Sequence, residues 1–222
     1  MTQRTLIIGD VHGCINELKS LVSKLNYDPK TDDMIFVGDL INRGPDSLGV
    51  WRYYQELGAR SVLGNHELHL IRDDQGIEVH KKWISHFKHQ FGDAYPEYLA
   101  DIKSWPLYIE TEDYLVVHGG LLPGEHPRNS DPLQLTSIRT YSPETGLQQS
   151  ETSQPWFDYY DEKKLVVFGH WAKLCGVKRP NVIGLDTGCV YGKKLTALIL
   201  PQVELVSVKA EKIYSQIKHQ AK

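Results

Sequence analysis

Hydrophobic and polar positions follow a repeating order in the first part of the chain. Three short apolar runs, Thr5–Ile8, Asp33–Val37 and Ser61–Leu63, each end at a glycine. Their length and their β-branched content predict strands. Between the first two runs, apolar residues recur at three- and four-residue spacing, as expected for one buried face of a helix: Ile15, Leu18, Val22 and Leu25.

A second helix is predicted from Ser47 through Leu57, because Pro45-Asp46-Ser47 offers a helix start signal. The chain thus reads strand, helix, strand, helix, strand. This order predicts parallel strands joined by right-handed crossovers.

The rest of the chain is predicted to be helical first and then rich in strands. Residues 67–105 have a mostly helical, polar pattern, and residues 123–160 form a long connection of the kind that often makes a lid or rim. The predicted later strands are Leu107–Glu110, Tyr114–Val117, Leu165–Phe168, Val182–Leu185, Leu195–Leu200 and Val203–Val208. We therefore expect an α/β fold of two packed, mixed sheets flanked by helices. Residues 1–208 would form a single domain, and Lys209–Lys222 a polar tail with a short solvated helix.

Composition excludes several classes of protein. The chain is 41% hydrophobic and 24% charged, as is usual for a globular protein, and its formal net charge of −3 argues against a broad basic face for nucleic acid. An anionic substrate remains possible if a metal supplies positive charge. Cys14, Cys175 and Cys189 lack the number and spacing of a disulfide framework or a metal finger. No run approaches the ~20 apolar residues of a membrane helix, and the apolar run near Met1 is too short for a signal peptide. We expect a cytoplasmic protein without a membrane partner.

Five polar clusters each follow a predicted strand directly. Their positions are Gly9-Asp10-Val11-His12-Gly13, Gly38-Asp39, Gly64-Asn65-His66-Glu67, His118-Gly119-Gly120 and Gly169-His170. Because ligands bind at the carboxyl ends of strands in an α/β sheet, these clusters are expected to converge.

The side chains of these clusters are those of a metal site without thiolates. Carboxylates and imidazoles suit Mn²⁺ above all, with Fe²⁺, Co²⁺, Zn²⁺ or Ni²⁺ as alternatives. We expect one ion to be held by Asp10 and His12, and the other by Asn65, His118 and His170. Asp39 would bridge the two ions, since a carboxylate has two oxygens. Two such ions can clamp the attacking and leaving oxygens of a phosphoryl transfer.

Each motif alone has an ordinary explanation. A lone histidine is more often a solvated or hydrogen-bonded side chain than a ligand, and Asn and Gly are common turn residues. The coincidence of five clusters favours the metal site. Six other histidines lack a place at a strand end and are assigned to surfaces or helices: His69, His80, His86, His89, His126 and His219.

The order of these motifs resembles the phosphoprotein-phosphatase branch of the calcineurin-like metallophosphoesterases. That signature reads Gly-Asp-x-His-Gly, Gly-Asp-x-x-x-Arg-Gly, Gly-Asn-His-Glu and two later histidines, and here it spans residues 5–200. The resemblance implies a β-sandwich of mixed sheets flanked by helices and agrees with the metal ligands above.

Within that branch, the chain is most similar to the symmetrical diadenosine tetraphosphate hydrolases and the phosphatases like them. The narrower likeness is carried by residues 38–47, by residues 118–124 with Asp131-Pro132 and Ile138-Arg139, by Gly169-His170-Trp171-Ala172, and by residues 185–192. The chain departs from this group in being shorter and in having Glu67 where Asp is common.

Roles for the neighbouring residues follow from the expected chemistry. His66 would protonate the leaving oxygen, and Asn42 stands where protein phosphatases have an Asp that orients this histidine. Arg43 and Arg139 are candidates to grip phosphoryl oxygens, although each has an alternative as a surface salt bridge.

Aromatic residues and one further acid have less specific roles. Trp171, Trp156, Phe157 and Tyr191 would either stack on a base or fill the core. Asp186 would either support the metal histidines or simply form a turn.

The predicted function is hydrolysis of dinucleoside polyphosphates, ideally of diadenosine tetraphosphate to two ADP. The alternatives are a phosphoprotein phosphatase for phosphoserine, phosphothreonine or phosphotyrosine, a polyphosphate or RNA-cap hydrolase, and a metal-binding scaffold without activity. The partner is thus expected to be a small nucleotide or, in the first alternative, a phosphoprotein.

Overall fold

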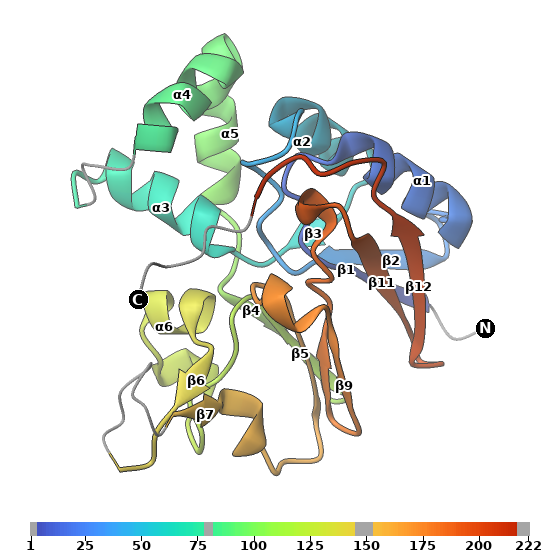
Figure 1. The fold of residues 1–222 in the computed structure, drawn as a ribbon, viewed down its shortest axis with the longest axis vertical. Helices are drawn as coiled ribbons and strands as arrows, with labels where there is room; N and C mark the ends of the chain where they lie inside the picture. Colours follow the sequence, from blue (N-terminus) through green and yellow to red (C-terminus); the bar gives the residue numbers. More distant parts are fainter. Residues whose placement is uncertain (1–3, 78–81, 145–152, 217–222) are drawn as a thin grey trace.

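Two five-stranded sheets lie face to face in the computed structural model, which describes residues 4–77, 82–144 and 153–216 (Figure 1). The first sheet has the order β12-β11-β1-β2-β3. Its strands are β1 (Arg4–Ile8), β2 (Asp32–Phe36), β3 (Arg60–Ser61), β11 (Lys194–Leu200) and β12 (Glu204–Lys209). β1, β2 and β3 are parallel, whereas β11 and β12 join the sheet in antiparallel pairs.

The second sheet has the order β4-β5-β8-β10-β9 and is also mixed. β5, β8 and β10 are parallel, and the two edge strands are antiparallel. Its strands are β4 (Tyr108–Glu110), β5 (Tyr114–Val117), β8 (Leu165–Phe168), β9 (Val177–Arg179) and β10 (Val182–Gly184), and a separate pair is formed by β6 (Thr140–Tyr141) and β7 (Gln154–Pro155).

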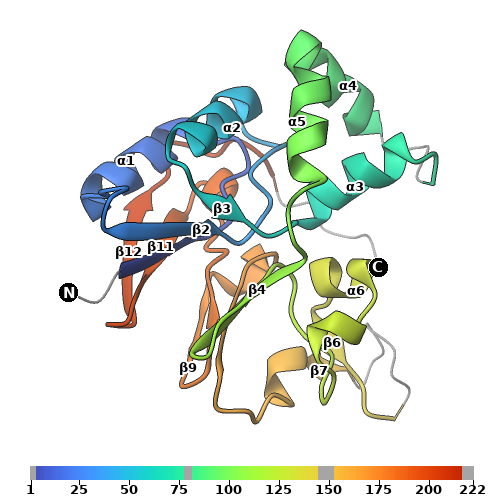
Figure 2. The same ribbon diagram turned by 180° about the vertical axis from the view of Figure 1, so that it is seen from behind.

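Helices cover the outer faces of both sheets, as the two opposite views show (Figures 1 and 2). The first sheet is covered by α1 (Ile15–Leu25) and α2 (Ser47–Glu56). A group of three helices, α3 (Asn65–Asp74), α4 (Lys82–Phe91) and α5 (Tyr95–Ile102), packs beside α2 and leads the chain to the second sheet, which is covered by α6 (Pro132–Ser137). Five short 3₁₀ helices complete the fold: η1 (Gly92–Ala94), η2 (Pro127–Asn129), η3 (Trp156–Asp158), η4 (Ala172–Leu174) and η5 (Cys189–Tyr191).

The central strands are apolar on both faces because each face is covered. In β1, Ile7 packs between the two sheets, whereas Leu6 and Ile8 belong to the core under the helices. In β8, Val167 lies between the sheets and Phe168 packs on the outer side. This alternation fixes the register, since a shift of one residue would exchange the two faces.

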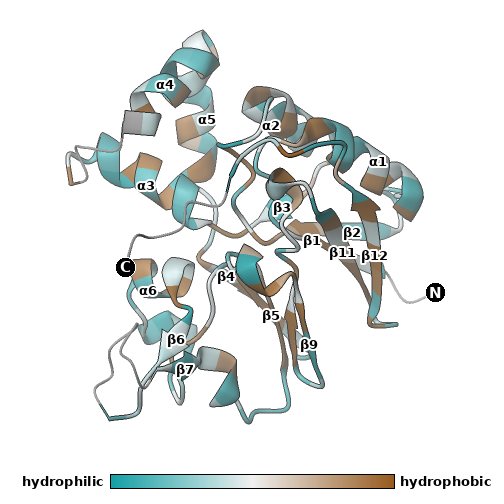
Figure 3. Ribbon diagram, viewed as in Figure 1, coloured by the Kyte–Doolittle hydropathy of each residue, from teal (hydrophilic) through white to brown (hydrophobic). Residues whose placement is uncertain are grey.

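The helices are amphipathic rather than uniformly apolar. In Figure 3 the strands carry most of the hydrophobic colour, while the helices alternate between the two colours. Across residues 4–77, 82–144 and 153–216, the structure contains no helix with the length and apolar character needed to span a bilayer.

The predicted architecture is confirmed, with strand ends displaced by at most two residues. The elements between residues 123 and 160, which are α6, β6, β7 and the 3₁₀ helices η2 and η3, were not predicted, and neither was β9. β6 and β7 are only two residues long, and β9 is a half-polar strand at the edge of its sheet. None of the three contains an apolar run, so the hydrophobic pattern of the sequence does not predict them.

The prediction of a solvated helix for Lys209–Lys222 is wrong for the described part, which ends at residue 216. No helix forms there, and Ala210 is only 5% exposed. The Tyr214 hydroxyl donates to Glu17 Oε1 at 2.9 Å, and the Glu211 backbone N–H donates to the same oxygen. The segment therefore packs on α1, because the buried carboxylate of Glu17 accepts hydrogen bonds from it.

Packing between the sheets generates a stability prediction. Ile7→Ala should lower the free energy of unfolding by about 2–5 kcal/mol, because the fully buried side chain leaves a cavity between two β-sheets. Ile77→Ala is the matched control, since Ile77 is 57% exposed and its loss should cost less than about 0.5 kcal/mol. Urea denaturation measures both, and equal losses would contradict the assigned core.

Candidate metal centre

The predicted ligands come from the carboxyl ends of parallel strands in both sheets. Asp10 follows β1, Asp39 follows β2, and Asn65 is the first residue of α3 just after β3. His118 follows β5 and His170 follows β8 in the opposite sheet. Since the two sheets are packed face to face, these strand ends meet at one edge of the sandwich.

The loops after β1 and β2 are held together by their backbones. The His12 N–H donates to the Asp39 carbonyl at 2.9 Å, and the Gly13 N–H donates to the Leu40 carbonyl at 2.8 Å. Gly38 begins the second loop with φ +92°, and a Cβ there would lie 2.7 Å from Gly64 Cα. Only glycine therefore permits this approach of the loops after β2 and β3.

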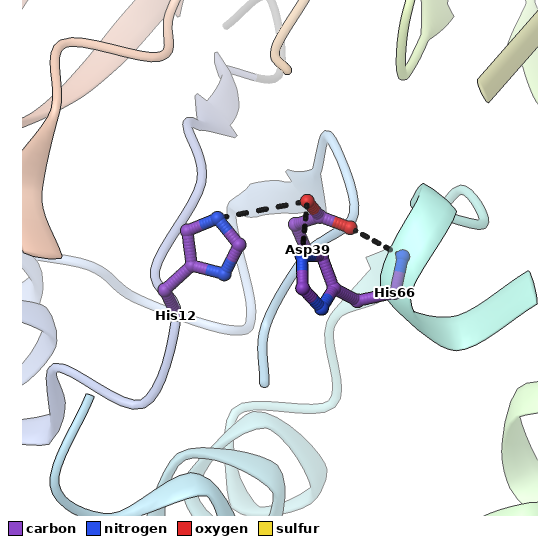
Figure 4. Close-up of side chains that lie close together, drawn as sticks. All are labelled: His12, Asp39 and His66. Atoms are coloured by element: carbon purple, nitrogen blue, oxygen red, sulfur yellow. Dashed lines mark hydrogen bonds and ion pairs between the residues drawn. The ribbon is translucent and has the colours of Figure 1, made fainter. Parts of the chain in front are cut away.

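Asp39 is the centre of the cluster. Its Oδ2 lies 3.6 Å from His12 Nε2, 4.0 Å from His66 Nε2 and 3.4 Å from His118 Nε2. Its Oδ1 accepts the His66 backbone N–H at 3.0 Å (Figure 4). The carboxylate thus faces histidines on two sides, and its role as a bridging ligand stays a prediction.

A second group of ligand atoms meets at Asn65. The Oδ1 atom of Asn65 lies 3.1 Å from His118 Nε2 and 2.8 Å from His170 Nδ1. Two compact sets with metal-binding spacing result, His12–Asp39–His66 and Asp39–His118–His170, and they share Asp39. Sharing of one carboxylate by two sets is the arrangement expected of a dinuclear centre.

Backbone carbonyls orient two of the imidazole rings. His12 Nδ1 donates to the Ile41 carbonyl at 2.9 Å, and His118 Nδ1 donates to the Val37 carbonyl at 2.7 Å. A carbonyl can only accept, so in the neutral ring each Nε2 keeps its lone pair toward Asp39. Such an outer hydrogen bond is typical of metal-binding histidine.

Asp10 lies beside the centre but in neither compact set. Both of its carboxylate oxygens accept the His170 backbone N–H, at 3.2 and 3.0 Å. Burial raises the pKa of Asp10 well above its usual value, and the nearby Asp186 and Asp39 raise it further, whereas His118 opposes them. A cation would relieve this crowding of negative charge, so Asp10 remains a predicted ligand.

Buried charge explains why the cluster attracts cations. Burial opposes ionisation of Asp39, but His118, His66 and His12 together lower its pKa well below the usual value. Burial would likewise lower the pKa of His118, but Asp39 and Asp10 raise it to about 10. A divalent ion can take the place of this proton, because metal binding releases protons from its ligands.

The donor set fits divalent cations in two further respects. His170 Nε2 is a buried polar atom without a hydrogen-bond partner, although its Nδ1 faces Asn65. The guanidinium of Arg43 donates to His12 Nε2 at 2.9 Å, so a positive charge already lies beside the atom that is predicted to bind the ion. The residues present therefore suit a metal pair of the predicted kind.

Unusual backbone conformations concentrate at this centre. Eight described residues other than glycine have positive φ, and five of them belong to the site: His12, Asp39, Asn42, Arg43 and His170. Such conformations cost of order 1–3 kcal/mol each and persist where surrounding structure enforces them. Here they turn side chains toward the centre.

Glu67 is a functional residue that the sequence motif did not explain. Its side chain is fully buried, and its two oxygens accept the backbone N–H groups of Asp39 and Leu40, each at 3.0 Å. Burial, with help from the charge of Asp39, raises the pKa of Glu67 to about 7. Glu67 therefore fixes the loop that carries the bridging carboxylate. The Gly-Asn-His-Glu motif marked its position, but only the fold shows what it contacts.

Asn42 contacts His66 as the resemblance implied. The Arg43 backbone N–H donates to Asn42 Oδ1 at 2.8 Å, which leaves Asn42 Nδ2 facing His66 Nδ1 at 2.9 Å. The amide donates to Nδ1, so the neutral ring carries its proton on Nε2, the nitrogen nearer Asp39.

Arg43 and Arg139 lie near each other without carboxylate partners. Neither forms a salt bridge within the described ranges. Burial, followed by the positive charge of Arg43, lowers the pKa of Arg139, and Arg139 Nε is buried and unpartnered. Arg43 also lies 5.8 Å from the ring centre of Tyr191. Among the described residues, the alternative role of Arg43 and Arg139 in surface salt bridges is therefore not supported.

The structure decides between the two roles predicted for Trp156 and Phe157. Trp156 and Phe157 are 1% and 5% exposed and pack in the outer core of the second sheet, so they cannot stack on a base. Trp171 and Tyr191 are half-buried and remain candidates.

Asp186 and the described histidines that were not predicted to be ligands lie in turns and helices. Asp186 accepts the Gly188 N–H at 3.1 Å, as in a turn, and burial raises its pKa to about 6. His69, His86 and His89 lie on helices and His126 caps η2, whereas His80 and His219 lie outside the described residues.

Known proteins resemble this chain along almost its whole length. A family model described as calcineurin-like phosphoesterase matches residues 3–206. A protein of Erwinia tasmaniensis named bis(5'-nucleosyl)-tetraphosphatase, symmetrical, is 33% identical over 87% of this chain and 93% of its own. A protein of the same name from Janthinobacterium sp. (strain Marseille) is 30% identical over 92% and 96%. A crystal structure described provisionally as a diadenosine tetraphosphatase has a TM-score of 0.83, 32% identity and 95% coverage of both chains.

The contacts of Glu67 generate a prediction about metal affinity. Glu67→Gln should weaken binding of Mn²⁺ by roughly 10- to 100-fold, because an amide nitrogen would face a backbone N–H and release the Asp39 loop. Glu97→Gln, at an exposed carboxylate paired with Arg52, is the control and should bind normally. Equilibrium dialysis with elemental analysis measures both, and unchanged affinity in Glu67→Gln would disprove the role.

Proposed function

Because this chain belongs to the calcineurin-like phosphoesterase family, we propose that it hydrolyses dinucleoside polyphosphates, foremost diadenosine tetraphosphate to two ADP. The family implies divalent metal ions. The proposal is supported by the spacing of Asp39 to histidines on two sides, His12 and His66 in one group and His118 and His170 in the other. The observation that carries the proposal is the pair of guanidinium groups, those of Arg43 and Arg139, which lie beside this centre and pair with no carboxylate of the described residues. Free cationic groups next to a metal site suit a substrate with several phosphates.

The six ligands would divide between two ions, with Mn²⁺ as the proposed metal. Asp10 and His12 would hold one ion, Asn65, His118 and His170 the other, and Asp39 both. When bound, such a pair activates water for in-line attack and neutralises charge on the phosphoryl group.

Arg43 and Arg139 would bind the phosphoryl oxygens. A guanidinium donates two parallel hydrogen bonds in a fixed fork, which matches two oxygens of a phosphate. Arg43 now donates to His12 Nε2, the predicted ligand atom, so binding of the ion would release its guanidinium toward the substrate. Trp171 and Tyr191, half-buried nearby, would contact the base or ribose.

His66 would assist departure of the leaving oxygen through its Nε2–H group. Its Nε2 carries the proton because Nδ1 accepts from Asn42, and it lies 4.0 Å from Asp39 Oδ2. A neutral imidazole holds this proton too tightly to transfer it to a phosphate oxygen and would stabilise that oxygen by a hydrogen bond alone. This suffices for ADP, a leaving group that departs as a stabilised anion. A serine oxygen would demand a stronger acid.

The substrate and the metal requirement can be tested together. The Mn²⁺-loaded protein should convert diadenosine tetraphosphate to two ADP, and chelation or Asp39→Asn should reduce turnover by roughly a thousandfold or more. Separation of the nucleotides by ion exchange identifies the products. ATP with AMP would contradict symmetrical cleavage, and rapid phosphopeptide hydrolysis without nucleotide turnover would favour a phosphoprotein phosphatase.

Asn42 should control the preference between leaving groups. Asn42→Asp is expected to raise kcat/KM for a phosphoserine peptide, relative to diadenosine tetraphosphate, by roughly tenfold or more, because a carboxylate accepts the Nδ1 proton and stabilises cationic His66. Asp tolerates the positive φ of 70° at this position.

Asn129→Asp, at an exposed position in η2, introduces the same charge away from the site and should leave the ratio unchanged. An unaltered ratio in Asn42→Asp would show that the amide does not select the leaving group.

A further inference from the structure

A cavity of about 610 Å³ opens where the edges of the two sheets meet, away from the metal ligands. It is lined by residues of β9 and β10 from one sheet and of β11 and β12 from the other. Figures 1 and 2 show β9, β11 and β12 on the same side of the molecule in both views. Its volume lies within the range of roughly 300–1,000 Å³ that is typical of small-molecule sites.

The lining of this cavity is strongly basic. Lys178, Lys193, Lys194 and Lys209 contribute to it, and no lining residue is an aspartate or glutamate. None of the four lysines forms a salt bridge with a carboxylate in the described ranges. Four uncompensated positive charges around one cavity contrast with the net charge of −3 for the whole chain. A cleft lined by one sign of charge concentrates the opposite ion.

The cavity also offers surfaces for an uncharged group. Val177 and Leu205 supply apolar surface, and Leu205 is 39% exposed. Ser207 and Thr187 also line it, although the Thr187 hydroxyl is bonded to the Lys194 carbonyl. A simple phosphate would fill only a small part of this volume. We propose that the cavity binds a nucleoside diphosphate, with its phosphates among the lysines and its base against Val177 and Leu205.

This nucleotide site is separate from the metal centre. None of its lining residues is a predicted metal ligand or one of the two arginines assigned to the substrate. The two sites share only the segment after β10, in which Thr187 and Lys193 line the cavity while Asp186 and Tyr191 face the centre. Binding of a nucleotide in the cavity requires no turnover and does not depend on the proposed substrate.

Cys175 provides a reporter inside the cavity. It lines the cavity and is exposed, with its Sγ 2.7 Å from Lys193 Nζ, whereas Cys14 and Cys189 are buried. Alkylation of the native protein should therefore modify Cys175 first. A nucleotide in the cavity would cover it.

The test is protection of Cys175 by ADP in the metal-loaded full-length protein. ADP should slow alkylation by iodoacetamide, as measured by mass spectrometry of the intact chain and its peptides, and adenosine should not. Lys178→Gln with Lys209→Gln should raise the half-protecting ADP concentration by roughly tenfold or more, since two charge-assisted contacts are lost. Lys193 stays unchanged because it contacts the reporter.

Two matched variants distinguish the sites. Lys30→Gln with Lys163→Gln removes the same charge at exposed positions outside the cavity and should keep normal protection. Arg139→Gln should also keep it, because Arg139 belongs to the metal centre. Absence of protection at millimolar ADP would overturn the proposal, as would equal protection in the Lys178/Lys209 variant or a loss of protection in Arg139→Gln.

Discussion

A buried carboxylate that must meet positive charge is the constraint on which the site depends. Asp39 is 2% exposed, and a charge in such a place is costly unless it is paired. Histidines surround its Oδ2, and the backbone of His66 donates to its Oδ1. The histidines that stabilise the carboxylate are also groups that bind divalent ions. Protonated histidines in the folded protein and bound metal ions would therefore stabilise the same buried negative charge.

Rigid supports keep this charge in place. Glu67 accepts two backbone N–H groups of the Asp39 loop, and Gly38 lets that loop approach the one after β3. The positive φ angles of His12, Asp39 and His170 are tolerated because strands apolar on both faces fix the ends from which these residues emerge. Packing energy between the sheets thus offsets local strain at their edge.

Positive charge outside the metal ligands determines what the site can accept. Burial and the positive charge of Arg43 lower the pKa of Arg139, yet no described carboxylate pairs with either arginine. A phosphate chain would supply the missing counter-charge. The cavity at the sheet edges also gathers positive charges without carboxylate partners in the described residues, but there they belong to lysines. The segment from Asp186 to Lys193 lies between this cavity and the metal centre.

The sequence by itself determined the fold class and most strands, and it named the candidate ligands. Apolar runs that end at Gly9, Gly38 and Gly64 marked the strand ends, because strand periodicity and glycine turns are local properties. The motif order carried the family assignment, which the matching of residues 3–206 bears out.

Only the tertiary structure decided which residues meet. Packing of the two sheets brings Asn65 to His118 and His170. The neighbouring strands β2 and β3 give Glu67 its backbone partners, and the outer face of the second sheet buries Trp156. It also docks Tyr214 on Glu17 where the local pattern had suggested a solvated helix. Such contacts join positions far apart in the chain, and neither side-chain periodicity nor local propensity contains information about them.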